Sequence, residues 1–289
     1  MLKRLSLLIS YFIIFLNIII FKIFHRNLRY LLQDSLRKLS VTKIRYNGIE
    51  LKFFTPSELT FWRAKTFSKK EPETLQWIDK FILSKNKKTI FWDIGANVGN
   101  YSIYASKKHK KKIEIIAFEP SGLNIGILAK NINLNKAEST VSICQIGLIN
   151  QKKSFFKMHE STDVEGGALS NFGNNLGFDG KKFNFSNKYK LFGTSIDDLI
   201  KDKVLKRPDY LKIDVDGNEH LILEKAQTIL RGNLIKSILI EINEDYKYQF
   251  NKVISILKKN NFKFKSKHLS PYALNSKFDK SFNYIFTKN

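Results

Sequence analysis

The 289-residue sequence predicts an α/β fold: a doubly wound, mainly parallel seven-stranded sheet that is preceded by a hydrophobic N-terminal helix. Two patterns indicate this fold. From residue 89 onward, short apolar segments alternate with helix-like segments, which is typical of buried parallel strands covered by helices on both faces. Glycines and acidic residues follow several of these apolar segments, where sheets of this kind bind their ligands.

Five of the expected strands are short apolar segments separated by helices, and the last two form an antiparallel pair. The predicted strands are residues 89–94, 113–118, 141–146, 210–213, 237–242, 262–265 and 282–287. The predicted helices between them are residues 101–107, 124–135, 219–230 and 250–260. Residues that follow the strands are the candidates for a functional site, because ligands bind at the carboxyl ends of such strands.

Residues 39–88 are predicted to form a hairpin and a helix that lead into the main domain. Apolar and polar residues alternate over residues 41–55 around Asn47-Gly48. This dipeptide accepts the positive φ angles of a tight hairpin turn. A helix is expected to include Pro72 in its first turn, a position that suits proline, and to continue to residue 82.

Residues 150–193 interrupt the alternation of strands and helices within the predicted domain, residues 89–289. The segment is rich in Gly, Asn, Ser and Phe. A loop of this length in a compact domain is usually functional or mobile, so we interpret it as a lid that binds the substrate. An ordinary surface insertion is the alternative.

The first 38 residues are predicted to form a hydrophobic helix with a basic flank. Residues 5–24 would span about 30 Å as a helix, the thickness of a bilayer's hydrocarbon core. We interpret them as a membrane anchor that spans the bilayer or lies in its interface, with a buried core helix as the alternative. Because more Lys and Arg residues follow the segment than precede it, the positive-inside tendency places the remaining chain in the cytoplasm.

The chain carries a formal net charge of +24, from 50 Lys and Arg against 26 Asp and Glu. This excess suits anionic partners such as lipid head groups, nucleic acid or a charged saccharide, with solvated surface lysines as the alternative. Nucleic acid is disfavoured because the charge is spread along the chain and no aromatic RNA-stacking motif accompanies it. Cys144 is the only cysteine, which excludes an intrachain disulfide and a thiolate metal cluster.

A glycine-containing turn follows the first predicted strand, with the sequence Asp93-Ile94-Gly95-Ala96-Asn97-Val98-Gly99. Gly95 and Gly99 allow a sharp turn and leave room for a ligand against bare backbone. Asn97 is one of the few residue types that tolerate a left-handed φ angle. The helix that follows would direct its N-terminal amides at the ligand. A tight turn without a ligand is the alternative.

An acidic residue also ends the second predicted strand. Glu119-Pro120 lies 24 residues after Gly95. In nucleotide-binding sheets, an acid at about this distance accepts hydrogen bonds from the ribose hydroxyls. A carboxylate suits this role because it offers two acceptor oxygens and no donor.

Further acids follow the fourth and fifth predicted strands. Asp214, Asp216 and Glu219 lie at one strand-to-helix junction, where their repulsion requires a cation, a proton or hydrogen-bond donors. Helix capping is the alternative for Asp216 and Glu219. Glu241 ends the fifth strand between apolar residues, so we expect it at a cleft or hydrogen-bonded within one.

Four segments taken together resemble the FkbM family of methyltransferases: FWDIGANVGNYS, IIAFEPSGLNIGILAKNINLN, YLKIDVDGNEHLILEKAQTIL and ILIEIN. The resemblance covers residues 71–243. It implies a class I methyltransferase fold, S-adenosylmethionine as the methyl donor, and an acceptor hydroxyl on a sugar, glycan or other secondary metabolite. Asp216 departs from the family pattern, which generally has Glu at this position.

The resemblance also implies roles for individual residues. The residues expected to hold the donor are Asp93, Gly95, Asn97, Gly99, Glu119, Pro120 and Gln145, the last of them near the adenine. Asp214 would face the transferred methyl group and the acceptor.

An alcohol acceptor requires a base to take its proton. Asp214 is the first candidate, followed by Glu241 and by His159 in the insertion. A divalent cation at Asp214 and Asp216 is an open alternative. The rival readings are a glycosyltransferase that uses Asp214-Val215-Asp216 as its metal site, and an RNA-binding or RNA-methylating protein. The glycosyltransferase leaves the glycine turn and Glu119 without a role.

Overall fold

The computed structural model describes residues 1–288 and comprises two compact units, Met1–Val41 and Thr42–Asn289. The first contains α1 (Leu2–Phe24) and α2 (Leu28–Leu39). By length and composition α1 is able to cross a membrane, with a mean hydropathy of 2.5 over its most apolar window. Its polar residue Asn17 accepts a hydrogen bond from the backbone N–H of Arg29 at 3.0 Å, so α1 contacts the first turn of α2.

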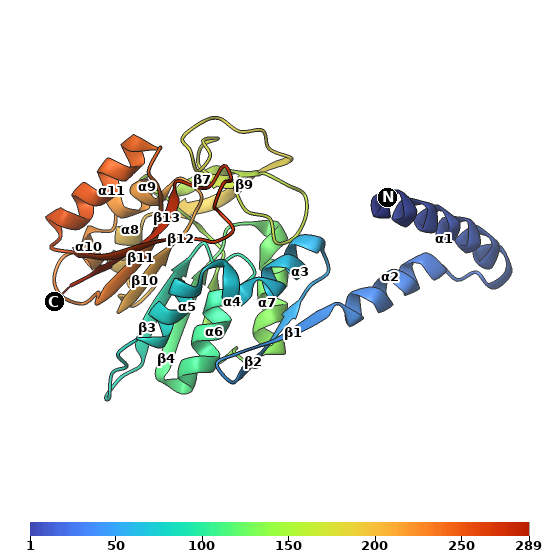
Figure 1. The fold of residues 1–289 in the computed structure, drawn as a ribbon, viewed down its shortest axis with the longest axis horizontal. Coiled ribbons are helices and arrows are strands. Elements are labelled where there is room, and N and C mark those ends of the chain that lie inside the picture. Colours follow the sequence, from blue (N-terminus) through green and yellow to red (C-terminus); the bar gives the residue numbers. More distant parts are fainter. Residues whose placement is uncertain (289) are drawn as a thin grey trace. The chain divides into compact units, whose positions relative to one another are not determined.

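The second unit is built on a seven-stranded sheet in the order β12-β13-β11-β10-β3-β4-β5 (Figure 1). Its strands are β3 (Thr89–Ile94), β4 (Ile113–Phe118), β5 (Val141–Cys144), β10 (Tyr210–Ile213), β11 (Ser237–Asn243), β12 (Lys263–Leu269) and β13 (Ser281–Thr287). The five neighbouring strands from β11 to β5 pair in parallel, and β13 pairs antiparallel with both β11 and β12. The predicted fold class and the antiparallel C-terminal pair are confirmed.

Helices cover both faces of this sheet. One face carries α5 (Pro72–Asp79), α6 (Asn100–His109) and α7 (Gly122–Leu134), and the other carries α8 (Ile196–Lys201), α9 (Glu219–Glu224), α10 (Gln227–Leu230) and α11 (Lys247–Lys259). A single turn of 3-10 helix, Lys110–Lys112, follows α6. Consecutive side chains of β3 point to opposite faces. Trp92 therefore packs with α8–α11 while Phe91 packs with α5–α7, and both are fully buried.

Several predicted elements have different bounds in the structure. The helix predicted to continue to residue 82 ends at Asp79, and the strand predicted at residues 262–265 spans Lys263–Leu269. The third strand ends at Cys144 instead of residue 146, because the chain leaves the main sheet there and Gly147 begins β6 in a second sheet. The predicted helix 219–230 is divided into α9 and α10. The division lies at Lys225, whose carbonyl accepts a hydrogen bond from the backbone N–H of Asp197 at 2.8 Å.

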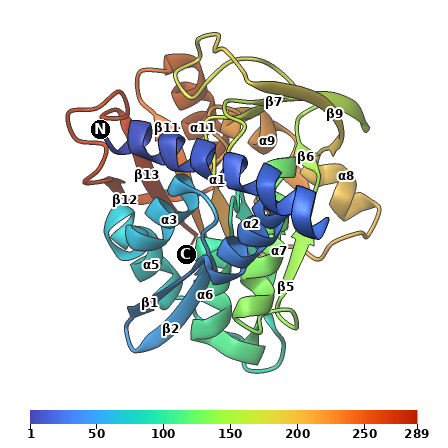
Figure 2. The ribbon, with the colours of Figure 1, turned by 90° about the vertical axis from the view of Figure 1, so that its right-hand side faces the viewer.

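The insertion, which we interpreted as a loop, contains strands. Together with β6 (Gly147–Leu148), which precedes it, the insertion forms a four-stranded sheet from β7 (Ser154–Glu160), β8 (Asn171–Phe172) and β9 (Asn187–Thr194) in the order β6-β9-β7-β8. A small apolar cluster of Ile149, Met158 and Phe172 holds these strands together. Figure 2 shows β7 and β9 at one edge of the domain. The second sheet gives the insertion a fixed framework beside the main sheet.

The predicted N-terminal hairpin consists of β1 (Val41–Tyr46) and β2 (Ile49–Phe54), followed by α3 (Glu58–Lys65) and α4 (Phe67–Lys70). Its turn has positive φ angles at Asn47 and Gly48, as the sequence predicts. Asn131 of α7 connects this hairpin to the turn after β3. Its side chain accepts a hydrogen bond from the N–H of Phe54 at 2.6 Å and donates one to the carbonyl of Val98 at 2.9 Å.

We expect Asn131→Ala to lower the free energy of unfolding by about 1–3 kcal/mol, because it removes the two hydrogen bonds by which this side chain joins the hairpin to the turn after β3. Urea unfolding of the full chain in detergent micelles, followed by tryptophan fluorescence, measures the change. The control is Asn133→Ala on the exposed side of the same helix, which should change stability by less than about 0.5 kcal/mol. Equal effects of the two substitutions would contradict the bridging role of Asn131.

Candidate active site

The turn after β3 brings two strand ends into direct contact. Gly95 has a φ angle of +83°, and a Cβ atom there would lie 1.7 Å from the backbone oxygen of Asp214. A side chain at this position is therefore excluded, and the turn lies against the end of β10. Asn97 adopts the left-handed φ angle expected for it (+51°), and Gly99 (+87°) is the N-cap residue of α6.

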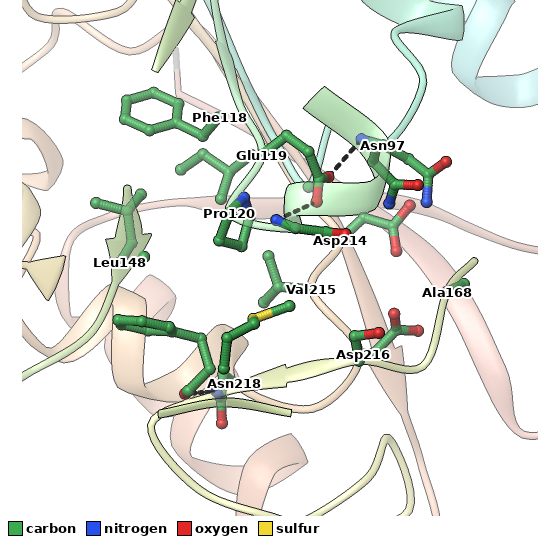
Figure 3. A pocket seen from close by; sticks show the side chains of 18 of the residues that line it. Asn97, Phe118, Glu119, Pro120, Leu148, Ala168, Asp214, Val215, Asp216 and Asn218 are labelled. Carbon is green, nitrogen blue, oxygen red and sulfur yellow. Dashed lines mark hydrogen bonds between the residues drawn. The ribbon is translucent and has the colours of Figure 1, made fainter. Parts of the chain in front are cut away.

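Glu119 connects this turn to the end of β4. One carboxylate oxygen accepts a hydrogen bond from the N–H of Asn97 at 2.7 Å, and the other accepts one from the N–H of Ser121 at 2.9 Å (Figure 3). Burial raises the pKa of Glu119 to about 7, although both hydrogen bonds favour the ionised form. Each oxygen retains a second lone pair with which to accept a ligand hydroxyl.

A pocket, here called the inner pocket, opens beside Glu119. Polar groups of the glycine turn and Glu119 line one side of it. Its other walls are apolar and come from both sheets, with Pro120, Ile146, Leu148, Met158, Phe172 and Val215 (Figure 3). This combination suits a ligand with a flat apolar part and hydroxyl groups.

Gln145, predicted to lie near the adenine, is exposed. Among the described residues, its neighbours Ile146 and Gly147 line the inner pocket and Gln145 does not.

A second space, here called the outer cleft, has a volume of about 500 Å³. It shares Gly95, Asn97, Asp214 and Asp216 with the inner pocket, so the two spaces meet at these residues. Glu241 of β11 lies on the outer cleft only. The remaining walls come from α3, α4, the insertion and the loop between β12 and β13, and they include Trp62, Arg63, Lys70, Phe178, Tyr272 and Phe278.

Three carboxyl groups converge where the spaces meet. One oxygen from each of Asp214, Asp216 and Glu241 lies within 4.8 Å of the other two. Burial would raise the pKa of Asp214, but the ammonium groups of Lys212 and Lys70 lower it to about 2. Burial and the negative charge of Asp214 raise the pKa of Asp216 to about 6, and the same causes raise the pKa of Glu241 well above its usual value. The cluster thus joins Asp214, which is ionised at neutral pH, to two carboxyl groups whose pKa values are raised.

Lys212 was not among the predicted site residues. Only 1% of its side chain is exposed, and its Nζ atom lies 2.8 Å from Asp214 Oδ2 and 3.9 Å from Asp93 Oδ1. The surrounding acids raise its pKa despite its burial, so it stays charged. The available sequence signal was a lysine inside an otherwise apolar strand, which requires a buried counter-charge.

Asp93 lies beneath the site instead of lining it. It is fully buried, and its second oxygen accepts a hydrogen bond from Ser102 Oγ at 2.6 Å. Among the described residues it lines neither the inner pocket nor the outer cleft. Its position beside Lys212 indicates that Asp93 helps to balance the buried charge of that lysine.

His159 is placed away from the cluster. It belongs to β7, where Met158 faces the inner pocket and the next side chain therefore points to the opposite side. Its ring packs 4.9 Å from that of Phe185 and is buried. Burial lowers its pKa. Among the described residues, His159 lines neither the inner pocket nor the outer cleft.

Glu219 and Asn218 stabilise the turn after β10. Glu219 accepts hydrogen bonds from the N–H groups of Val215 and Gly217 and from the side chain of Gln249. Burial raises its pKa to about 8. Asn218 donates to the insertion, at Asn171 Oδ1 and at the Phe172 carbonyl, both at 2.8 Å. These residues position the acidic turn and fix the insertion against it.

A family model described as the methyltransferase FkbM domain matches residues 93–264. The chain belongs to the FkbM methyltransferase family. The match begins at Asp93 and includes the glycine turn, Glu119 and the acidic cluster. It therefore favours the methyltransferase reading over the glycosyltransferase reading.

Among curated proteins, the FkbM chain is similar to methyltransferase sdnD from Sordaria araneosa. The two are 27% identical over 170 residues, which cover 52% of this chain and 64% of sdnD. The chain thus spans less than two thirds of that relative.

Two solved structures illustrate the likeness of the chain to known folds. Precorrin-6y C5,15-methyltransferase from Geobacter metallireducens has 14% identity, coverage of 76% of this chain and 87% of its own, and a TM-score of 0.43. Fibrillarin from Aeropyrum pernix, solved with bound S-adenosyl-L-methionine, has 14% identity, coverage of 86% and 82%, and a TM-score of 0.44.

We expect Lys212→Met to lower the free energy of unfolding by about 3–5 kcal/mol, because it leaves buried carboxylates without their cation. Lys206→Met, which removes an exposed ion pair with Glu114, is the control and should cost less than about 1 kcal/mol. Urea unfolding in detergent compares the two. Since the folded pKa of Asp214 lies below its ordinary 3.8, its stabilising contribution is present above pH 4 and is lost as the pH falls toward 2. A small effect of Lys212→Met at neutral pH would contradict this assignment.

Proposed function

We propose that this chain is an S-adenosylmethionine-dependent methyltransferase that methylates a hydroxyl oxygen on a sugar, glycan or other secondary metabolite. The observation that carries this proposal is the meeting of two spaces at Asp214 and Asp216. The inner pocket has the polar and apolar groups that an adenosyl donor requires. The outer cleft has room for an acceptor. Membership of the FkbM family supports the same reaction.

The residues of the inner pocket fit the parts of the donor. Glu119 would accept hydrogen bonds from the ribose hydroxyls, and Pro120, Ile146 and Phe172 would surround the adenine. Gly95 and Asn97 would hold the methionine end against bare backbone. Gly99, predicted for the same role, is not among the described residues that line the inner pocket, and a Cβ atom there would meet Leu128 at 2.4 Å. When bound, the donor supplies an electrophilic methyl group on a positively charged sulfur. The ionised Asp214 at the junction of the two spaces favours a positive charge there.

The acidic cluster would hold the acceptor hydroxyl and take up its proton. Asp214 stays ionised at neutral pH and can accept a hydrogen bond from the hydroxyl, which orients the oxygen toward the inner pocket. Glu241 remains a second candidate base, although burial and the neighbouring carboxylates raise its pKa and so disfavour its ionised form. The pKa of Asp216, about 6, is closer than that of Asp214 to the value that suits a general base at pH 7. His159 faces away from this cluster, and we assign it no role.

A divalent cation is a second proposal for the same three carboxylates, since hard cations take carboxylate oxygens. It would have to compete with Lys212, which already holds Asp214 at 2.8 Å. Turnover measured with EDTA, and again after addition of Mg²⁺ or Mn²⁺, decides between the cation and the lysine. Full turnover in EDTA is expected if Lys212, and not a cation, is the positive partner of Asp214.

We also propose that α1 anchors the protein in a membrane, with the catalytic unit in the cytoplasm. The helix has the length and apolar composition of a membrane span. Lys22, Arg26, Arg29 and Arg37 follow its apolar part, against Lys3 and Arg4 before it, which places its C-terminal side in the cytoplasm.

The affinity for S-adenosylhomocysteine should rise about tenfold between pH 6 and pH 8, because Glu119 with a pKa of about 7 must ionise to accept the ribose hydroxyls. Isothermal titration calorimetry of the full chain in detergent measures this dependence. Glu119→Gln should weaken binding and flatten the pH dependence. A wild-type affinity that is independent of pH would remove Glu119 from the donor site.

Asp214→Asn should lower turnover by about 10²–10⁴-fold, the usual contribution of a positioned acid–base group. The measurement is transfer of a labelled methyl group into glycan, lipid and RNA fractions of the source cell. Affinity for S-adenosylhomocysteine should stay close to the wild-type value, which shows that the variant is folded. Asp163→Asn, at an exposed position of the insertion, is the control and should leave turnover unchanged. Near-normal turnover of Asp214→Asn would refute the role.

A further inference from the structure

The mouth of the outer cleft is bordered by exposed apolar and aromatic side chains. We call this surface the aromatic rim: Leu59, Phe61 and Trp62 of α3, with Tyr272 and Leu274 of the loop between β12 and β13. Between 37% and 62% of each of these residues is exposed. The proposed reaction chemistry gives no reason to expose so many large apolar groups together.

The two parts of the aromatic rim form one surface. The rings of Trp62 and Tyr272 contact each other edge to face, with 5.8 Å between their centroids. Close by, Ser270 Oγ donates a hydrogen bond to the carbonyl of Lys70 at 2.6 Å, which joins the loop to α4. A joined patch of apolar side chains on a surface marks an interaction site more often than scattered ones do.

The aromatic rim and the outer cleft share part of their walls. Leu59, Trp62 and Tyr272 line the cleft, while Phe61 and Leu274, among the described residues, lie outside it. Whatever covers the rim therefore lies at the entrance through which an acceptor reaches Asp214.

Basic residues surround the aromatic rim. Four exposed lysines lie in the same two segments as the rim: Lys65 of α3, Lys69 of α4, and Lys277 and Lys280 of the loop. The acids in these segments are Glu58 and Asp279. Protein segments at a membrane–water interface typically combine Trp and Tyr with neighbouring Lys residues. The cores of protein–protein interfaces are instead depleted in Lys. The charge and the residue types together favour an anionic lipid surface.

We propose that the aromatic rim docks on an anionic membrane surface, so that the outer cleft takes its acceptor from the polar layer of the bilayer. The acceptor is then an amphiphile with a hydroxylated head group joined to a lipid, and this part rests on the proposed methyltransferase function. The head group passes Trp62 and Tyr272 to reach the acidic cluster while its apolar part stays in the membrane. Attachment by α1 would raise the local concentration of the rim at the surface.

Trp62 provides a direct probe of this docking in the full chain. Trp77 and Trp92, the other two tryptophans, are 7% and 0% exposed, whereas Trp62 is 37% exposed. The experiment reconstitutes the full chain in phosphatidylcholine vesicles with or without phosphatidylglycerol. Quenching of tryptophan fluorescence by lipids brominated near the head group then reports contact between Trp62 and the bilayer.

We expect quenching in the vesicles that contain phosphatidylglycerol, its loss in Trp62→Phe, and at least a twofold decrease in the double variant Phe61→Ser/Leu274→Ser. Quenching of the wild-type chain should also be weaker in neutral vesicles and at high salt, because basic residues contribute to the attraction between the protein and the membrane. Iodide in the water should reach Trp62 less well once anionic vesicles are present.

Equal quenching in wild type and Trp62→Phe would overturn the proposal. Shielding of Trp62 from iodide without quenching by brominated lipid would also overturn it, since a protein partner or a second copy would then cover the rim. Phe61→Ser/Leu274→Ser should bind S-adenosylhomocysteine like the wild type, which shows that it is folded. If no variant and no wild-type chain binds S-adenosylhomocysteine, the proposed reaction fails while the quenching result still decides the docking.

Discussion

The buried charge of Lys212 is the interaction on which the acidic edge of the sheet depends. Its ammonium group lies between Asp93 and Asp214 and is almost completely shielded from water. Three carboxyl groups within 4.8 Å of one another would otherwise reduce their repulsion by taking up protons. With Lys212 in place, Asp214 remains ionised, while burial and the charge of Asp214 raise the pKa of Glu241. The cluster can therefore combine hydrogen-bond acceptance with proton exchange in one cleft.

The fold brings this charged edge next to a ligand space because parallel strands end together. Gly95 allows the turn after β3 to touch the end of β10, and Glu119 joins that turn to the end of β4. The insertion closes the remaining side with a sheet of its own, fixed by Asn218. The site is thus assembled from backbone contacts between strand ends, and the side chains that perform chemistry are added to that frame.

The sheet and the donor side of the site could be predicted because their signals are local. Apolar runs mark the strands, and Gly95, Asn97 and Glu119 occur at fixed positions after strands. Lys212 was not assigned, although Asp214 lies two residues away, because its second partner Asp93 comes beside it only through the pairing of β3 with β10. His159 was chosen by residue type and Gln145 was placed by the family resemblance. The face of a strand changes with every residue, and among the described residues neither side chain lines the two spaces. The second sheet was missed because its strands are separated by glycine-rich turns.

A structure of the full chain with S-adenosylhomocysteine bound tests the central claim most directly. The account predicts that the ribose hydroxyls contact Glu119, that the adenine lies among Pro120, Ile146 and Phe172, and that the sulfur faces Asp214 at the opening to the outer cleft. A ligand bound elsewhere, or one whose sulfur points away from Asp214 and the outer cleft, would contradict it.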